Sequence, residues 1–393
     1  MDLKIKPIKN NVYYIGSKDI NRKLFDQLVP LPQGTTYNSY LVKGSEKTAI
    51  IDTDYPKKLD EYQKRLEENN ITKVDYIISN HAEQDHSGGI PMLLEMYPDA
   101  KVVTNAKVKE NVMNMLHVAE DKFIVINDGD ELSLGDKTFK FILAPFVHWP
   151  DTMFTYLKED NMLFTCDFLG AHYTKNDLFA DYTNDLIEAV KRYYAEIIMP
   201  FRNFAKKYTQ QVKEMNLELI LPSHGPIYDK PEWILGLYED WTSDRVENKV
   251  VIPYVSMYES TSMLVDRLNQ KLTEAGIEVK LFDLAHCDEG ELSMELVDCA
   301  TVVLGSSMVL AGPHPAAVMA AYLTNALRPK LRYYSIIGSY GWGGNLEGTL
   351  EKMFTIIKPE KLDYVVIKGR PRDVDFEKID ELAKQIIEKH KNL

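Results

Sequence analysis

The stretch His81-Ala82-Glu83-Gln84-Asp85-His86 decides how the first half of this chain is interpreted. It follows a largely apolar run, residues 74–79, which is typical of a buried strand, and it precedes a Ser-Gly-Gly turn. Two imidazoles and two carboxylates therefore enter one small volume. Groups packed so closely repel one another or stay unsatisfied unless a cation holds them. The stretch predicts a metal site, and the alternative is a solvated polar loop.

Three more residues of ligand type stand at the ends of predicted strands: His148, Asp167 and His224. Taken singly, a histidine in such a place is more often an ordinary hydrogen-bonded residue. With the first stretch, however, they make seven ligands, four histidines and three carboxylates. Zinc sites use only three or four protein ligands, so this larger set favours a dinuclear centre. Because carboxylate is a hard oxygen ligand, Glu83 shifts the preference toward iron or manganese.

Bulk properties narrow the class of protein. The chain has 393 residues, 45% hydrophobic and 27% charged, with a net charge of −13 and no run of Lys or Arg. Nucleic-acid binding is therefore not expected. The N-terminus has no apolar core of signal-peptide length, and no stretch reaches the apolar length of a membrane span. The cysteines, Cys166, Cys287 and Cys299, form no Cys-x-x-Cys pair. We expect a cytoplasmic protein without disulfides and without a fused rubredoxin or iron–sulfur module.

The chain divides into two patterns. Short strands and helices mix up to residue 247, which indicates a sheet-rich layered α/β domain over 1–247. From residue 248 to 393, five strands alternate with five helices, as in a doubly wound parallel sheet. The predicted strands of this second domain are 250–255, 278–284, 301–304, 332–337 and 364–367, and its helices are 262–275, 292–299, 316–327, 346–356 and 375–390.

Three loops of the second domain follow strands whose carboxyl ends meet at one sheet edge, where doubly wound sheets bind ligands. In the first loop, hydroxyls before a helix are typical of an anion site, and the alternative is an ordinary helix cap. In the third loop, aromatic side chains between glycines can stack on a flat ring, and the alternative is a packed aromatic turn. The candidate residues are Ser256, Met257, Tyr258, Glu259, Ser260 and Thr261; Ser306, Ser307, Met308, Val309, Leu310 and Gly312; and Ser339, Tyr340, Gly341, Trp342 and Gly343.

The order His-x-Glu-x-Asp-His, His, Asp, His resembles the metallo-β-lactamase fold as it occurs in flavodiiron proteins (A-type flavoproteins). Hydrolases of that superfamily usually carry a second histidine where this chain has Glu83. The resemblance implies an αββα sandwich that binds two irons, one through His81, Glu83 and His148, the other through Asp85, His86 and His224, with Asp167 bridging. In some members the residue at the position of His86 does not bind metal.

The second half resembles flavodoxin, which implies FMN with its phosphate in the first loop and its ring between the other two. Flavodoxin-like loops usually have Gly where this chain has Glu259, and a carboxylate beside a phosphate is unfavourable unless it points outward. No Gly-x-Gly-x-x-Gly fingerprint is present, so a nicotinamide site is not indicated.

Together the resemblances cover essentially the whole chain and imply an oxidoreductase that reduces O2 to water, NO to N2O, or both. FMN would relay electrons from an external donor, rubredoxin or reduced coenzyme F420, and head-to-tail homodimers or dimers of dimers are expected. The resemblance also suggests His172 and Tyr194 as pocket residues. Two alternatives remain: a dizinc hydrolase fused to a flavodoxin domain, and an electron carrier with a degenerate metal site.

Overall fold

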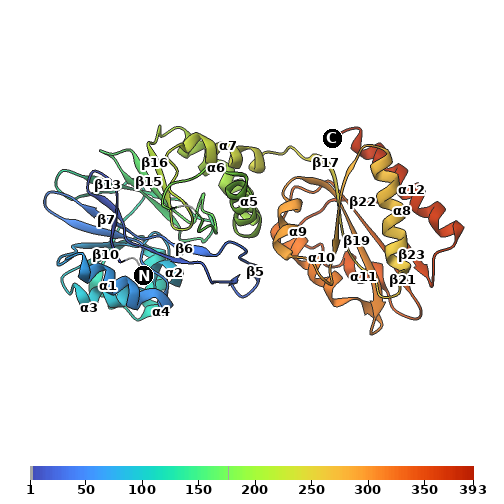
Figure 1. Ribbon diagram of the computed structural model, residues 1–393, viewed down its shortest axis with the longest axis horizontal. Coiled ribbons are helices and arrows are strands. Elements are labelled where there is room, and N and C mark those ends of the chain that lie inside the picture. Colours follow the sequence, from blue (N-terminus) through green and yellow to red (C-terminus); the bar gives the residue numbers. More distant parts are fainter. Residues whose placement is uncertain (1–2, 176) are drawn as a thin grey trace. The chain divides into compact units, whose positions relative to one another are not determined.

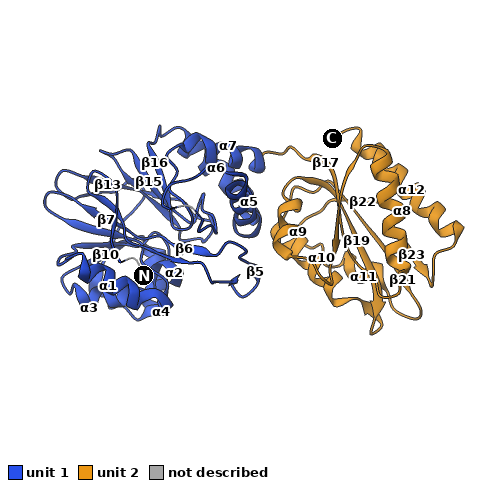
Figure 2. Cartoon of the chain, in the orientation of Figure 1, with its two compact units in different colours: residues 1–242 blue, residues 243–393 orange. Residues whose placement is uncertain are grey.

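The computed structural model describes residues 3–175 and 177–393 and divides the chain into two compact units, Met1–Thr242 and Ser243–Leu393 (Figure 2). The predicted boundary after residue 247 lies slightly later, at the first residue of β17 (Glu247–Val255). Each unit is described below by itself.

Unit 1 contains two large sheets (Figure 1). The first has the order β1-β2-β7-β8-β9-β10-β11, and the second has the order β12-β13-β14-β15-β16. Two hairpin-like pairs, β3 with β6 and β4 with β5, complete the unit. The strands are β1 (Lys6–Lys9), β2 (Val12–Tyr14), β3 (Ser17–Asp19), β4 (Leu24–Phe25), β5 (Val29–Pro30), β6 (Thr35–Tyr37), β7 (Tyr40–Lys43), β8 (Thr48–Ile51), β9 (Tyr76–Ile78), β10 (Lys101–Thr104), β11 (Phe123–Val125), β12 (Glu131–Ser133), β13 (Thr138–Leu143), β14 (Met153–Leu157), β15 (Met162–Cys166) and β16 (Leu219–Pro222).

Helices cover the outer faces of both sheets (Figure 1). The first sheet is covered by α1 (Leu59–Glu68), α3 (Ile90–Met96) and α4 (Ala106–Leu116), and the second by α5 (Asn184–Tyr193), α6 (Arg202–Lys213) and α7 (Pro231–Thr242). The arrangement is the expected metallo-β-lactamase-like αββα sandwich. Helix α4 is an addition to the predicted elements, and Asn105 caps it by accepting hydrogen bonds from two backbone N–H groups of its first turn.

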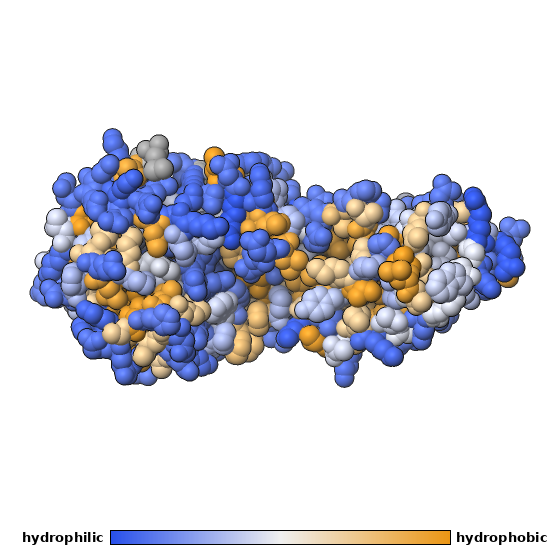
Figure 3. All heavy atoms as spheres, turned by 90° about the horizontal axis from the view of Figure 1, so that it is seen from below, coloured by the Kyte–Doolittle hydropathy of each residue, from blue (hydrophilic) through white to orange (hydrophobic). Residues whose placement is uncertain are grey.

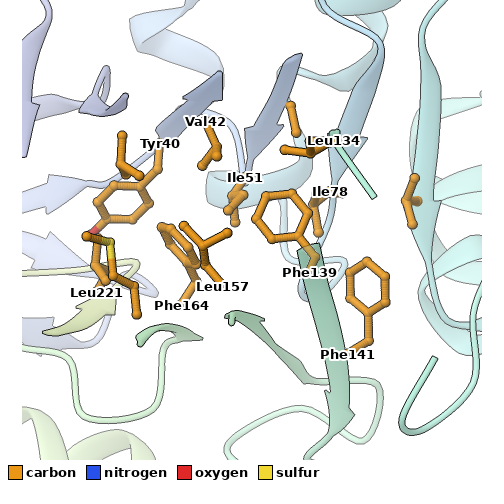
Figure 4. Packing of buried hydrophobic residues seen from close by; sticks show 14 of the residues in the cluster. Tyr40, Val42, Ile51, Ile78, Leu134, Phe139, Phe141, Leu157, Phe164 and Leu221 are labelled. Atoms are coloured by element: carbon orange, nitrogen blue, oxygen red, sulfur yellow. The ribbon is translucent and has the colours of Figure 1, made fainter. Parts of the chain in front are cut away.

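The core of unit 1 lies between the two sheets (Figure 4). Val42, Ile51 and Ile78 from the first sheet pack there with side chains from the second, among them Phe139 and Phe164. Each large apolar side chain buried in this way contributes about 1.5–3 kcal/mol. This packing fixes the strand ends at one edge of the sandwich, and the predicted metal ligands follow those ends.

Unit 2 has a parallel sheet whose strands follow the order β18-β17-β19-β21-β23, which is the flavodoxin-like order. All five predicted strands are present. Two short strands, β20 (Gly312–Pro313) and β22 (Glu360–Lys361), extend it. The remaining elements are β18 (Glu278–Asp283), β19 (Cys299–Val309), β21 (Tyr333–Tyr340), β23 (Val365–Lys368), α8 (Ser260–Glu274), α9 (Glu289–Leu296), α10 (Pro315–Leu327), α11 (Leu346–Glu351) and α12 (Asp373–His390).

The second predicted ligand loop of unit 2 is in fact mostly a hairpin. β19 continues to Val309 and turns back onto β20. The turn residues Leu310 and Ala311 both have positive φ, 52° and 62°, the backbone of a tight two-residue hairpin turn. β21 likewise runs through Tyr340. The strand ladders therefore hold several of the predicted flavin-binding residues in place.

The surface shown in Figure 3 is mainly hydrophilic, with hydrophobic residues scattered in small patches. Isolated exposed apolar residues of this kind are normal for globular proteins. Among the residues that the structure describes, no helix is both long and apolar enough to cross a bilayer.

Candidate metal centre and flavin loops

The seven predicted metal ligands come together at one edge of the sandwich in unit 1. His81 and Glu83 follow β9, and Asp85 and His86 lie in the short helix α2 (Gln84–Ser87). The other three follow strands of the second sheet: His148 after β13, Asp167 directly after β15, and His224 after β16. These three strands run in the same direction, so their carboxyl ends lie at the same edge.

The ligand atoms form two groups. His81, Glu83, His148 and Asp167 make the first, and Asp85, His86 and His224 make the second, with the ligand atoms of each group lying within 4.8 Å of one another.

Asp167 joins the two groups. Its Oδ2 lies 2.9 Å from His81 Nε2 and 3.1 Å from His148 Nε2. Its Oδ1 lies 3.1 Å from His86 Nε2 and 3.4 Å from His224 Nε2. One carboxylate oxygen thus faces each group, as in a carboxylate that bridges two metal ions.

The chemistry of the cluster fits cations. His81 Nε2, Glu83 Oε2, both Asp85 carboxylate oxygens and Asp167 Oδ1 are buried and make no hydrogen bond. Buried polar atoms normally have a partner. In the metal-free protein, burial lowers the pKa of His86, but the adjacent Asp85 and Asp167 outweigh it and raise the pKa to about 9. The lone pairs and carboxylates of the cluster are therefore arranged for positive charge.

In three of the predicted histidine ligands, Nε2 faces the cluster and Nδ1 points away from it, and the surroundings of this Nδ1 differ. His224 Nδ1 lies 2.5 Å from the Thr36 carbonyl oxygen, and His81 Nδ1 lies 3.1 Å from Cys166 Sγ. His86 Nδ1 is buried and has no partner. A metal-bound imidazole usually donates this N–H to an acceptor, which fixes the ring. His86 points into the cluster but is the least fixed of these three rings.

The cluster is most open on the side of the first group. The side chains of His148 and Glu83 are 14% and 17% exposed, whereas those of Asp85 and Asp167 are 7% and 3% exposed.

His172 lies beside the cluster, as predicted from the resemblance. Its ring is 5.1 Å from that of His224 and 4.7 Å from that of Phe25, and its Nδ1 lies 2.8 Å from Thr35 Oγ1. Burial, followed by the nearby His224, holds the pKa of His172 well below its usual value, so the ring is neutral. Its Nε2 is buried without a partner.

Tyr194, the other predicted pocket residue, does not face the cluster. Its hydroxyl donates to the Trp241 carbonyl at 3.3 Å, and its ring packs on Tyr238 and Trp241 beside α7. The neighbouring Tyr193 faces the cluster instead, with its ring 4.9 Å from His172 and 6.0 Å from His224. The Tyr193 hydroxyl is buried and unpartnered. A π-helical turn, Tyr194–Ile198, begins directly after it and changes the register of the helix.

The predicted flavin loops lie at the carboxyl ends of β17, β19 and β21. Thr261 Oγ1 and Ser339 Oγ are 2.9 Å apart and join the first loop to the third. Ser307 Oγ is buried and has no partner. Around these hydroxyls, Tyr258 and Trp342 are 83% and 71% exposed.

Space beside these loops is open. A side-chain carbon added at Gly312, Gly341 or Gly343 would meet nothing within 4 Å. Open backbone, an unpartnered hydroxyl and exposed aromatic rings fit a flat ligand that carries polar groups. Glu259 begins α8 with φ +63°, a left-handed conformation that favours glycine, and its side chain is exposed.

Three residues near the cluster were not predicted from the sequence. They are Tyr193, Phe25, and Cys166, which contacts His81. Tyr193 had a signal, because Leu186, Val190 and Tyr193 follow the helical period and are all buried. The contacts of Phe25 and Cys166 depend on tertiary packing and had none.

Comparison with known proteins identifies the family. A model described as "ODP family beta lactamase" matches residues 35–225. The nitric oxide reductase of Moorella thermoacetica is 32% identical, with 96% of this chain and 97% of that protein covered. The coenzyme F420H2 oxidase of Methanothermobacter marburgensis is 32% identical, with 97% and 98% covered.

Solved structures agree over both units. Rubredoxin oxygen:oxidoreductase from Desulfovibrio gigas matches with a TM-score of 0.94 at 27% identity, covering 98% of each chain. A flavo di-iron protein variant from Thermotoga maritima matches with a TM-score of 0.89 at 25% identity, also covering 98% of each. Relatives above 30% identity along nearly the whole chain, together with these structures, establish the relationship. The chain belongs to the flavodiiron proteins, a family of oxidoreductases.

Proposed function

We propose that this protein reduces O2, NO or both at a diiron centre that receives electrons through FMN. The observation that carries the proposal is the position of Asp167, with one oxygen directed to each of two ligand groups. The names of the relatives support the same chemistry: one is a nitric oxide reductase, another an F420H2 oxidase, and a structural neighbour is a rubredoxin oxygen:oxidoreductase.

The ligand groups assign the residues that would hold each iron. His81, Glu83 and His148 would hold one, Asp85, His86 and His224 the other, and Asp167 both. Two Fe(II) and a reduced flavin together store four electrons, the number that converts O2 to two waters. With three carboxylates against two divalent ions, the site carries little net charge, which suits its burial.

The protein supplies polar groups at the edge of this centre. His172 Nε2 and the Tyr193 hydroxyl are buried, unpartnered and next to His224. Both can hydrogen-bond to a small molecule bound at the centre, and the neutral state of His172 lets its ring nitrogens serve as one donor and one acceptor.

FMN would bind at the loops of unit 2, through Ser256–Thr261, Ser306–Gly312 and Ser339–Gly343. The donor would be external, because none of the three cysteines belongs to a Cys-x-x-Cys pair. Rubredoxin and reduced coenzyme F420 are the two candidates, since the names of relatives include each. The cytoplasm is the proposed compartment, and a head-to-tail homodimer or dimer of dimers is the proposed assembly.

The test is anaerobic stopped-flow of the fully reduced protein, after metal and flavin have been quantified. We expect about two irons and one FMN per chain, and rapid flavin reoxidation by O2, by NO or by both. Slow reoxidation by both gases would overturn the proposal. Two zincs in place of iron, with thioester hydrolysis, would favour the hydrolase instead.

The tyrosine pair gives a matched prediction. Tyr193→Phe should lower turnover about 10-fold, which corresponds to about 1.4 kcal/mol, the contribution of one hydrogen bond. Its stability should change little, because the lost hydroxyl has no partner among the described residues. Tyr194→Phe should leave turnover unchanged but cost about 1 kcal/mol of stability, because it loses the bond to Trp241. Turnover at saturating gas and thermal unfolding of both variants measure this, and the reverse pattern would restore Tyr194 to the pocket.

Glu259 gives a prediction for the flavin. Glu259→Gly should bind FMN about 3- to 10-fold more tightly, because it removes a negative charge near the phosphate, worth about 1 kcal/mol. Relief of the left-handed strain stabilises the flavin-free and the FMN-bound protein alike and leaves the dissociation constant unchanged. Quenching of FMN fluorescence on titration into flavin-free protein measures the dissociation constant. Glu259→Gln is the control that removes only the charge, and it should gain the same effect. Unchanged or weaker binding by the Gly variant would show that Glu259 does not oppose FMN.

A further inference from the structure

We infer that Cys166 is a positioning residue that orients His81 and sets the electron density of that ligand. The inference rests on the proposed diiron function. Cys166 is fully buried, and its Sγ lies 3.1 Å from His81 Nδ1. On the opposite side of the ring, His81 Nε2 lies 2.9 Å from Asp167 Oδ2. With Nε2 on a metal ion, Nδ1 carries the proton and donates it to the sulfur.

The thiol is not itself a ligand. The His81 ring stands between Sγ and the cluster, and neither ligand group includes Cys166. The sulfur therefore acts only through the imidazole. It holds the ring at the angle at which Nε2 points to the first group, and it fixes the proton on Nδ1.

The backbone of this segment explains how one residue does this. β15 ends at Cys166, which has a positive φ of 53°, and the β15–β16 ladder shifts register there. In a regular strand the side chains of 166 and 167 would point to opposite faces. The left-handed turn instead lets Asp167 enter the cluster while Cys166 lies behind His81. The Cys166 carbonyl also accepts the Ser223 N–H at 2.7 Å, next to His224.

Comparison with His224 shows what the sulfur changes. The Nδ1 of His224 meets the Thr36 carbonyl oxygen at 2.5 Å, a strong acceptor, whereas that of His81 meets a thiol, a weak acceptor. A weaker acceptor leaves the imidazole less electron-rich. With sulfur behind His81, the first group therefore stabilises a ferric ion less than it would with an oxygen acceptor in the place of the sulfur. Cys166 thus favours the ferrous state of the iron in that group.

The experiment compares Cys166→Ala and Cys166→Ser in the full-length protein loaded with metal and FMN. Cys299→Ala is the matched control, because Cys299 is equally buried but lies in β19 of unit 2. Two quantities are measured: metal affinity by chelator competition, and the ferric/ferrous midpoint potential by a redox titration followed by EPR.

We expect Cys166→Ala to weaken metal binding about 10- to 100-fold, as losses of outer hydrogen bonds to metal ligands do. Cys166→Ser supplies an oxygen acceptor, so it should keep affinity and move the midpoint to lower potential. The control should change neither.

Unchanged affinity in Cys166→Ala together with an unchanged midpoint in Cys166→Ser overturns the inference. Equal changes in Cys299→Ala would do so too, since they would indicate a general loss of stability. If the Ala variant does not fold, the midpoint of the Ser variant decides. A wild-type protein that holds no iron contradicts the proposed function instead, and chelator competition with the metal it does hold still tests the contact between Cys166 and His81.

Discussion

Replacing Asp167 with alanine is expected to remove both irons and to lower turnover at least about 1,000-fold, equivalent to about 4 kcal/mol in the barrier. The reason is that this one carboxylate faces both ligand groups, at 2.9 Å from His81 Nε2 and 3.1 Å from His86 Nε2. Without it, each group keeps three side chains but loses the anion shared between the two metal ions. Iron per chain, measured after gel filtration under anaerobic conditions, and NO- and O2-dependent reoxidation of the flavin report the two losses.

One control variant and one further measurement separate this effect from a general loss of structure. Asp177→Ala removes an aspartate of the same unit whose side chain is 83% exposed and forms an ion pair with Lys6, and it should leave iron and turnover unchanged. FMN content should stay near one per chain in Asp167→Ala, because the flavin loops belong to unit 2. Retention of two irons by Asp167→Ala would show that the carboxylate does not bridge.

The metal ligands could be predicted from sequence because the site is made where strands end. Apolar runs mark the strands, and polar residues directly after them lie at a common edge, so His81, Asp167 and His224 could be placed together without a structure. The same periodicity predicted a sheet-rich layered α/β first domain and a doubly wound second domain, and the resemblance to flavodiiron proteins supplied the αββα sandwich. In the structure the seven residues lie in two neighbouring groups at that edge.

What sequence could not supply depends on register and packing. Tyr193 and Tyr194 are adjacent and both buried, and the helical period of α5 favours only Tyr193. The π-helical turn that begins at Tyr194 has no signal in that period. The contact of Cys166 with His81 requires a positive φ in a residue that is not glycine, which no propensity predicts. The hairpin of β19 and β20 likewise depends on two left-handed residues, Leu310 and Ala311, at its turn.

In the metal-free protein, the free energy of unfolding is expected to depend on pH in a way that the metal-bound protein does not share. In the metal-free cluster, burial lowers the pKa of His148, but Asp167 and Glu83 outweigh it and raise the pKa to about 9, as Asp85 and Asp167 do for His86. A folded-state pKa above the unfolded value of about 6.5 stabilises the fold fully below pH 6.5, and this contribution is lost as the pH rises through 9. We expect the free energy of unfolding of the metal-free protein to fall by up to about 3 kcal/mol per imidazole between pH 6.5 and 9.

The affinity for metal depends on pH in the opposite direction and rises with pH, because a histidine must be neutral to bind a metal ion. If His81, His86 and His148 each release a proton, the apparent affinity rises about 1,000-fold per pH unit over this range. The stabilisation by iron should therefore grow as the pH rises. Urea unfolding of the two forms at pH 6.5, 7.5 and 8.5 measures the divergence, and anaerobic calorimetry in two buffers of different ionisation enthalpy counts the protons.

Single histidine variants show whether these protons come from the cluster. His148→Asn should release about one proton fewer than the wild type, because it deletes one of the three cluster histidines whose pKa is raised, His81, His86 and His148. His286→Gln, at an exposed position in unit 2, should release the same number as the wild type. If iron bound at pH 7.5 without releasing protons, the imidazoles would already be neutral in the metal-free protein. The carboxylates would then repel one another without compensation, and the metal-free form would instead gain stability as the pH falls toward their ordinary pKa values near 4.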